Sequence, residues 1–234
     1  MWNCDGHLAS WRTAAFSLEM DLSRPTRGIS EWTRGGVKHS SMRLLSAIWQ
    51  PARSSSDSET IEDCYPRGRD LIVTYAQTPE RSVRPQVYWR MIVDESQGSS
   101  AGPMPLGVEW IVSMQTSFLD SQPQVDSVSD FDSADWKLES VDCYGCPAFV
   151  ARPTDGKSPS ILIAAHPSDC QVHQMDESSS DTVALRFRLF TESLEKGVIR
   201  RGRIRAHLLD TPSNEATIER AISQFLASEP PLTT

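Results

Sequence analysis

Long apolar segments are missing from this sequence: no stretch approaches the roughly 18 apolar residues that a membrane-spanning helix needs. The N-terminus also lacks a basic region followed by a continuous apolar run, so we predict no secretory signal. Basic residues are in deficit, with 23 Lys and Arg against 31 Asp and Glu, giving a formal net charge of -8. This charge disfavours nonspecific binding to nucleic acid or to anionic lipid.

Cysteine is scarce as well. The chain has five cysteines, an odd number scattered along the sequence, which suits reduced thiols in a cytoplasm better than a disulfide framework. The motifs G-x-S-x-G, Walker A, G-x-G-x-x-G and H-E-x-x-H are all absent. Regular βαβ alternation is absent too, which argues against Rossmann and TIM folds. We therefore expect a cytoplasmic protein without a cofactor that binds neither nucleic acid nor membranes.

Short strand signals, separated by turns and polar loops, occupy most of the chain. Residues 86–94 are almost continuously apolar and predict a strand covered on both faces. Residues 106–118 alternate, with Trp110 on the apolar face and Glu109 on the polar face. Near the end, apolar residues at helical spacing predict a helix at about 213–227.

These signals predict a mainly β fold, a many-stranded antiparallel β-sandwich with a C-terminal α-helix. We expect a single domain over residues 1–234, because no composition break divides the chain. Three Ser- and Asp-rich segments predict long acidic loops, at about 54–63, 121–135 and 176–181.

Two arginine-rich segments stand out in this acidic chain. Residues 183–191 and 198–208 both resemble strands, with arginines at alternate positions and therefore on one face of each strand. Guanidinium groups bind carboxylates and phosphates and donate to sugar hydroxyls, which predicts a site for a carbohydrate or small anion. The predicted ligand-binding residues are Arg186, Arg188, Arg201, Arg203, Arg205 and Trp110. Alternatively, these arginines pair with carboxylates of neighbouring strands, such as Glu109.

Aromatic residues at Tyr88, Trp89, Trp110 and Trp136 could stack on sugar rings or belong to the core. A second pattern, C-x2-C-x19-H-x3-C-x2-H, resembles the spacing of zinc ligands. Its members are Cys143, Cys146, His166, Cys170 and His173. The alternative is a set of ordinary buried cysteines and loop histidines.

Acid–base chemistry is a third candidate. Glu109 lies on a polar strand face and His166 ends an apolar strand, so the pair could move a proton between a sugar hydroxyl and a ring oxygen. Alternatively, His166 hydrogen-bonds a loop carbonyl. We treat Glu109 and His166 as the predicted catalytic residues.

Two resemblances add to these observations. The tract from Arg186 to Leu208, with Glu229 to Thr234, resembles an uncharacterised family of planctomycete bacteria. The strand rhythm and arginine-rich hairpin of residues 60–210 are similar in outline to the galactose mutarotase-like β-sandwich proteins. That resemblance implies a sugar groove lined by Arg, His and Glu, and in the epimerases a Glu base and a His acid. Matching residues here are Glu109, His166 and Arg203 or Arg205.

Three functional hypotheses follow. The first is a binding module for a carbohydrate or small anion on the arginine face. The second is a sugar-epimerase-like enzyme that uses Glu109 and His166. The third is a structural or assembly protein, in which the arginine face meets an acidic patch on another copy in a homo-oligomer.

Overall fold

Antiparallel strands make up most of the chain. The computed structural model describes residues 1–49, 58–93, 105–179, 181–210 and 215–229. In this part of the chain the strands form sheets of five, eight, four and two strands, and α1 (Glu215–Leu226) is the one α-helix. The prediction of a mainly β, antiparallel sandwich with a C-terminal helix is confirmed. No helix among these residues is both long and apolar enough to cross a membrane.

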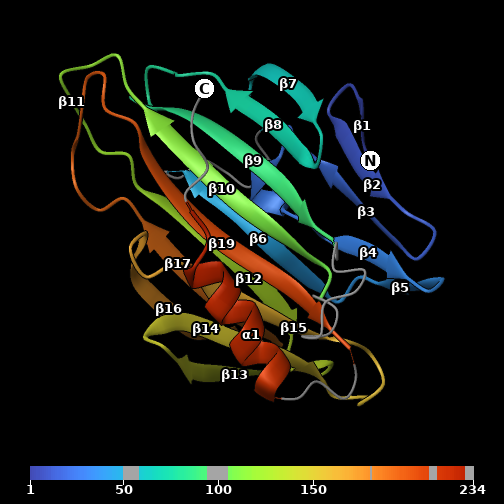
Figure 1. Cartoon of the computed structure of the whole chain (residues 1–234). Helices are drawn as coiled ribbons and strands as arrows, with labels where there is room; N and C mark the ends of the chain where they lie inside the picture. The colour runs from blue at the N-terminus through green and yellow to red at the C-terminus, as the bar shows by residue number, and fades with distance from the viewer. Residues whose placement is uncertain (50–57, 94–104, 180, 211–214, 230–234) are drawn as a thin grey trace.

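The eight-stranded sheet carries the residues of interest, and its order is β13-β14-β15-β19-β10-β9-β8-β7. Its strands are β7 (Ile61–Arg67), β8 (Asp70–Tyr75), β9 (Arg84–Ile92), β10 (Gly107–Gln115), β13 (Trp136–Cys143), β14 (Cys146–Pro153), β15 (Ser160–Ala165) and β19 (Arg200–Leu209). Although β19 is the last strand in sequence, it lies in the middle of the sheet, between β15 and β10 (Figure 1). It therefore joins two groups of strands formed from earlier segments.

A four-stranded sheet packs behind the eight-stranded sheet. Its order is β16-β17-β12-β6. A separate two-stranded sheet pairs β11, which precedes β12 in the chain, with β18, which follows β17. These strands are β6 (Met42–Trp49), β11 (Asp120–Ser121), β12 (Val125–Asp132), β16 (Cys170–Ser179), β17 (Thr182–Leu189) and β18 (Leu194–Glu195). Phe187 of β17 meets Phe149 of β14 with ring centroids 5.9 Å apart, so the inner faces of the two sheets share one core.

The N-terminal segment forms a five-stranded meander of order β1-β2-β3-β4-β5. Its elements are β1 (Trp2–Asp5), β2 (Leu8–Arg12), β3 (Phe16–Asp21), the short 3-10 helix η1 (Pro25–Arg27), β4 (Glu31–Arg34) and β5 (Val37–His39). Trp11, Leu18 and Trp32 of this sheet are buried in the same cluster as the inner residues of the two larger sheets. The three sheets thus bury their apolar faces together.

α1 lies on the outer face of the eight-stranded sheet, the face turned away from the shared core. Ile218, Ala221, Ile222 and Phe225 pack on outward-facing residues of β14, β15 and β19, as their helical spacing predicts. The helix covers the side of the sheet formed by β13 to β19 and does not extend over β7, β8 and β9 (Figure 1). We call the part formed by β7 to β10 the open half of the outer face.

The three predicted acidic loops differ from the structure. Of residues 54–63, Ile61–Asp63 belong to β7, and 54–57 lie outside the described residues. Residues 121–135 contain β12, whose Ser127 and Ser129 are buried and whose Asp126 and Asp130 pair with arginines of adjacent strands. Most of 176–181 belongs to β16, an edge strand. Small serines and cross-strand ion pairs allow such polar segments to form strands.

Two predictions about strand burial also need correction. β9 alternates between buried and half-buried residues, so the segment 86–94 is not covered on both faces. Conversely, β10 is buried on both faces except at its last residue, although a polar face is predicted there. Arginines from neighbouring strands fold over Glu109 of β10 and leave it only 2% exposed.

Candidate functional site

The register of the eight-stranded sheet aligns charged side chains into one row across five strands. Glu109 of β10 lies opposite Arg205 of β19 on one side and Arg90 of β9 on the other. Arg90 lies opposite Asp70 of β8, and Asp70 lies opposite Arg67 of β7. Charges of alternating sign therefore follow one another across the outer face, an arrangement that stabilises neighbouring strands.

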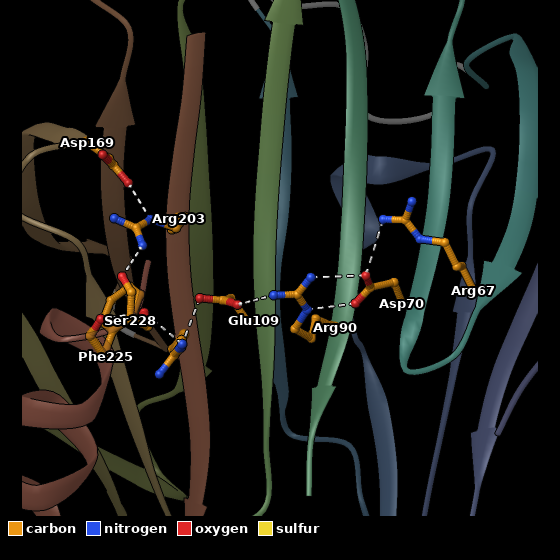
Figure 2. A network of polar contacts seen from close by, with 9 residues as sticks. Arg67, Asp70, Arg90, Glu109, Asp169, Arg203, Phe225 and Ser228 are labelled. Atoms are coloured by element: carbon orange, nitrogen blue, oxygen red, sulfur yellow. Dashed lines mark hydrogen bonds and ion pairs between the residues drawn. The ribbon is translucent and has the colours of Figure 1, made fainter. Parts of the chain in front are cut away.

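Short contacts connect every step of this row (Figure 2). Arg205 donates from Nε to Glu109 Oε1 at 3.0 Å, and Arg90 Nη1 lies 3.7 Å from Glu109 Oε2. Arg90 also donates from Nε and Nη2 to the two oxygens of Asp70, at 2.7 and 3.0 Å. Arg67 reaches Asp70 Oδ2 at 3.7 Å. Hydrogen bonding to Asp70 raises the pKa of Arg90, while partial burial opposes the shift.

The row ends under α1, where arginines hold the end of the helix. Arg203 donates to Asp169 Oδ2 and to the carbonyl oxygen of Ser228, both at 3.0 Å. Arg205 donates to Ser228 Oγ at 3.1 Å and lies 4.5 Å from the ring centroid of Phe225. Cations at the C-terminal end of a helix interact favourably with its dipole. Burial lowers the pKa of Arg205, and the carboxylate of Glu109 opposes that shift.

Glu109 and His166, the predicted acid–base pair, do not face a common open space. β19 separates their strands, and both oxygens of Glu109 are engaged by arginines. His166 bonds Ser168 Oγ through Nδ1 at 2.7 Å, and its ring meets Phe225 edge-on at 5.4 Å. Burial and then Arg203 lower the pKa of His166. Phe225 thus contacts both His166 and Arg205.

The five predicted ligand-binding arginines do not form one face. Arg186 and Arg188 project from β17 of the four-stranded sheet, whereas Arg203 and Arg205 project from β19 of the eight-stranded sheet. Since both sheets turn their apolar residues toward the shared core, the two arginine sets lie on opposite outer faces. The prediction of a continuous arginine face is wrong in this respect, because β17 and β19 do not pair.

Asp126 of β12 holds the two arginines on the four-stranded sheet. Arg186 donates to its Oδ2 at 2.9 Å, and Arg188 donates to both oxygens at 2.8 and 3.1 Å. Burial opposes ionisation of Asp126, but the hydrogen bonds from Arg188 and Arg186 together hold its pKa below the ordinary value. The alternative of carboxylate pairing thus describes Arg186, Arg188, Arg203 and Arg205.

Three of the four aromatic candidates belong to the core. Trp110 is fully buried, and Trp89 and Trp136 are each 4% exposed. The prediction that Trp110 contacts a ligand is therefore wrong, because its ring is enclosed between the sheets. Tyr88 differs, since it lies on the outer face of β9 and is only half-buried.

The predicted zinc ligands are not brought together. Within the residues that the structure describes, no three His, Cys, Asp or Glu side chains are grouped to hold a metal ion. Cys146 donates to the carbonyl of Ala165 at 3.3 Å and Cys170 to that of Val172 at 3.4 Å, while His173 packs on Phe149. Burial raises the pKa of Cys143, and it raises those of Cys146 and Cys170 to about 11 each. These thiols have the environment of ordinary structural cysteines.

Beside this row, the open half of the outer face carries further polar residues that are partly exposed. Burial raises the pKa of Tyr88, and the positive charges of Arg201 and Arg67 oppose that shift. Tyr65 of β7 and Tyr88 lie opposite Ile72 of β8 from its two sides, and Tyr65 is 39% exposed. Tyr88 itself donates to Gln86 Oε1 at 2.6 Å. This cluster combines two phenols with guanidinium groups in a partly exposed position.

Sequence reasoning did not single out Tyr65, Arg67, Asp70 or Arg90. The signal was present in part, because Gln86, Tyr88 and Arg90 occupy alternate positions and must share a strand face. The sequence did not show that this face would meet Asp70 of β8 and Glu109 of β10, since that depends on strand order and register.

The sheets form an antiparallel β-sandwich, and this fold is shared with solved structures of low sequence identity. No family model matches the chain, and no curated protein matches it. Among solved structures, a candidate aldose 1-epimerase from Klebsiella pneumoniae subsp. pneumoniae superposes with a TM-score of 0.52 and 8% identity. The match covers 94% of this chain and 83% of that one.

A candidate kojibiose phosphorylase from the human microbiome is also similar, with a TM-score of 0.45 and 9% identity. The match covers 95% of this chain and 28% of that chain. The likeness to the aldose 1-epimerase candidate concerns the fold alone, because function resides in site residues rather than in the fold. The resemblance to a planctomycete family stays a prediction.

Proposed function

We propose that this protein binds a carbohydrate, preferentially an acidic sugar, on the open half of the outer face. The ligand would contact Tyr65, Tyr88, Arg67 and Arg90 of this half, together with Arg201 of the adjacent strand β19. Arg203 and Arg205 would support the network from beneath α1. Carbohydrate is the ligand class suggested by the similar solved structure, whose name denotes action on an aldose.

The observation that carries the proposal is the fixed orientation of partly exposed arginines. Asp70, whose side chain is 10% exposed, holds Arg90 by two hydrogen bonds and also contacts Arg67. The arginine side chains themselves remain 35% and 51% exposed. Donors held in place before binding lose little conformational entropy when a ligand arrives, which favours affinity.

Charge and ring chemistry favour an acidic sugar in particular. The network of Figure 2 contains four arginines and three carboxylates, and Arg201 adds a further cation beside Tyr88. The network itself has one more positive than negative charge, whereas the whole chain has a net charge of -8. Guanidinium groups bind carboxylates in a bidentate manner, and the phenol rings offer faces for a sugar ring.

Thermal-shift and calorimetric titrations with glucuronate, galacturonate, glucose and galactose test the proposal. We expect a sugar acid to stabilise the folded protein by RT ln(1+[L]/Kd) and so to raise the Tm. The neutral sugars should raise the Tm less. Arg67→Ala and Tyr88→Ala should each weaken binding by roughly 10-fold or more, the loss expected for one charge-assisted contact or one stacked ring. Because Arg67 is exposed, its replacement should leave stability within about 1 kcal/mol of the wild type.

Arg152→Ala is the matched control, since Arg152 is an exposed arginine paired with Glu139 at the opposite side of the same sheet. It should bind the sugar acid as the wild type does. Loss of binding in Arg186→Ala, with none in Arg67→Ala, would assign the ligand to the four-stranded sheet instead. If none of the sugars binds, the proposed function is rejected.

A further inference from the structure

We propose that Cys4 and Cys64 form a reversible disulfide that joins the N-terminal five-stranded sheet to the eight-stranded sheet. Their sulfur atoms lie 3.9 Å apart although the residues are 60 positions apart in sequence. Both side chains are half-buried against the shared core. Cys64 directly precedes Tyr65 of the proposed carbohydrate site, but the two side chains lie on opposite faces of β7, with Cys64 turned toward the core.

The two cysteines lie on strands that end their respective sheets. β1 is the first strand of the five-stranded sheet, and β7 is the last strand of the eight-stranded sheet. Trp2 of β1 donates from Nε1 to the carbonyl of Arg69, just beyond β7, at 2.9 Å. This contact holds β1 in place beside the β7–β8 hairpin. A disulfide has an S–S distance of about 2.05 Å, so the two sulfurs must approach by nearly 2 Å when the bond forms.

The contact between the thiols indicates which one reacts first. Cys64 donates its S–H to the sulfur of Cys4. Burial and then the neighbouring Cys4 raise the pKa of Cys64 to about 12, so Cys64 remains the protonated donor of the pair. The thiolate is the nucleophile in disulfide exchange, and a donated S–H stabilises it. Cys4 is therefore the attacking residue.

With glutathione disulfide as the oxidant, the reaction balances in two exchanges. Cys4 thiolate attacks one sulfur of glutathione disulfide, forms a mixed disulfide and releases one glutathione thiolate. Cys64 then loses its proton to solvent and attacks the Cys4 sulfur, forming the Cys4–Cys64 bond and releasing the second glutathione thiolate. The two protein thiols are oxidised by two electrons, which reduce one glutathione disulfide to two thiols.

Burial and hydrogen bonding distinguish the other three cysteines from this pair. Cys143 and Cys146 lie opposite each other at the β13–β14 turn, but both are buried, whereas Cys4 and Cys64 are half-buried. Cys146 and Cys170 each donate to a backbone carbonyl. Oxidation should therefore be selective for the pair formed by Cys4 and Cys64.

The test equilibrates the full chain with glutathione disulfide, blocks free thiols with iodoacetamide and maps peptides without reduction. We expect one linked peptide containing Cys4 and Cys64, with a mass two hydrogens below the sum of the reduced peptides. The linkage closes a long loop, so the oxidised protein should melt higher by about 5 °C or more. Dithiothreitol should reverse both changes.

Cys64→Ser and Cys4→Ser are matched controls, because each keeps a small half-buried side chain and removes one partner. Each should show no linked peptide and no rise in Tm with glutathione disulfide. The proposal is overturned if both cysteines of the wild type are still alkylated by iodoacetamide, or if each carries only its own glutathione. An equal rise in Tm for wild type and Cys64→Ser would also overturn it.

Discussion

Glu109 receives Arg205 on one carboxylate oxygen and Arg90 near the other, while its side chain is only 3% exposed. A general base must be free to accept a proton from a substrate within hydrogen-bond reach. The contacts of Glu109 instead match those of a buried counter-ion, which offsets the cost of placing Arg205 beneath α1.

Substitution of Glu109 by Gln tests this role. We expect Glu109→Gln to lower the free energy of unfolding by about 3 kcal/mol, because Arg205 would remain buried without its counter-charge. Urea denaturation measures the change. Glu139→Gln is the control, since Glu139 is 55% exposed and pairs with Arg152, and it should change stability by less than about 1 kcal/mol. If both substitutions change the free energy of unfolding by the same small amount, Glu109 does not act as a structural counter-ion.

The packing of α1 determines which charged residues of the eight-stranded sheet are covered. Its residue Phe225 is 1% exposed and has Arg205, Arg203 and His166 around its ring. The helix therefore covers residues that, on an uncovered sheet, would be available to a ligand. Its existence and its buried stripe could be predicted from spacing alone, but its docking place could not.

Truncation of Phe225 tests the helix packing. We expect Phe225→Ala to lower the free energy of unfolding by about 3 to 5 kcal/mol, through loss of buried area and of cation–π contacts. Leu226→Ala is the neighbouring control, and because Leu226 is only half-buried the loss should be smaller. Differential scanning calorimetry compares the two variants. A smaller effect for Phe225→Ala than for Leu226→Ala would contradict the packing described here.

At the scale of the whole molecule, one buried histidine links folding to pH. His207 of β19 is 1% exposed, and its Nδ1 bonds the carbonyl of Pro105 at 3.2 Å. Burial, with Arg205 nearby, lowers its pKa from 6.5 to about 4, so the folded protein holds this imidazole neutral. Between these two values the unfolded chain binds more protons at this position than the folded chain does.

Stability should therefore fall as the pH falls from about 6.5 toward 4, by at most about 1.4 kcal/mol per pH unit from this residue. Above pH 6.5 the contribution of His207 is fully present. Urea unfolding of wild type and His207→Gln across this window measures the difference in slope. Parallel slopes would show that other groups account for the whole pH dependence.

Local sequence patterns predicted individual strands and the helix, whereas the pairing of distant strands could not be predicted from them. Periodicity identified β10, β17, β19 and α1, because alternation and helical spacing are local properties. The same approach missed β12, where buried serines and paired aspartates give a loop-like composition. It also joined Arg186 and Arg203 on one face, because sheet membership depends on contacts between distant segments. The row from Arg205 to Arg67 depends on the register of five strands, which periodicity in the sequence does not reveal.

The central place of β19 has a consequence for biosynthesis. Its partners β10 and β15 are synthesised before residues 200–209, and both are almost entirely buried strands in the finished sheet. Until β19 arrives, each presents an unpaired apolar edge of the kind that recruits strands from other chains. Between the synthesis of β15 and that of β19 the nascent sheet therefore consists of two incomplete pieces, and premature termination in this interval would release a chain prone to aggregate.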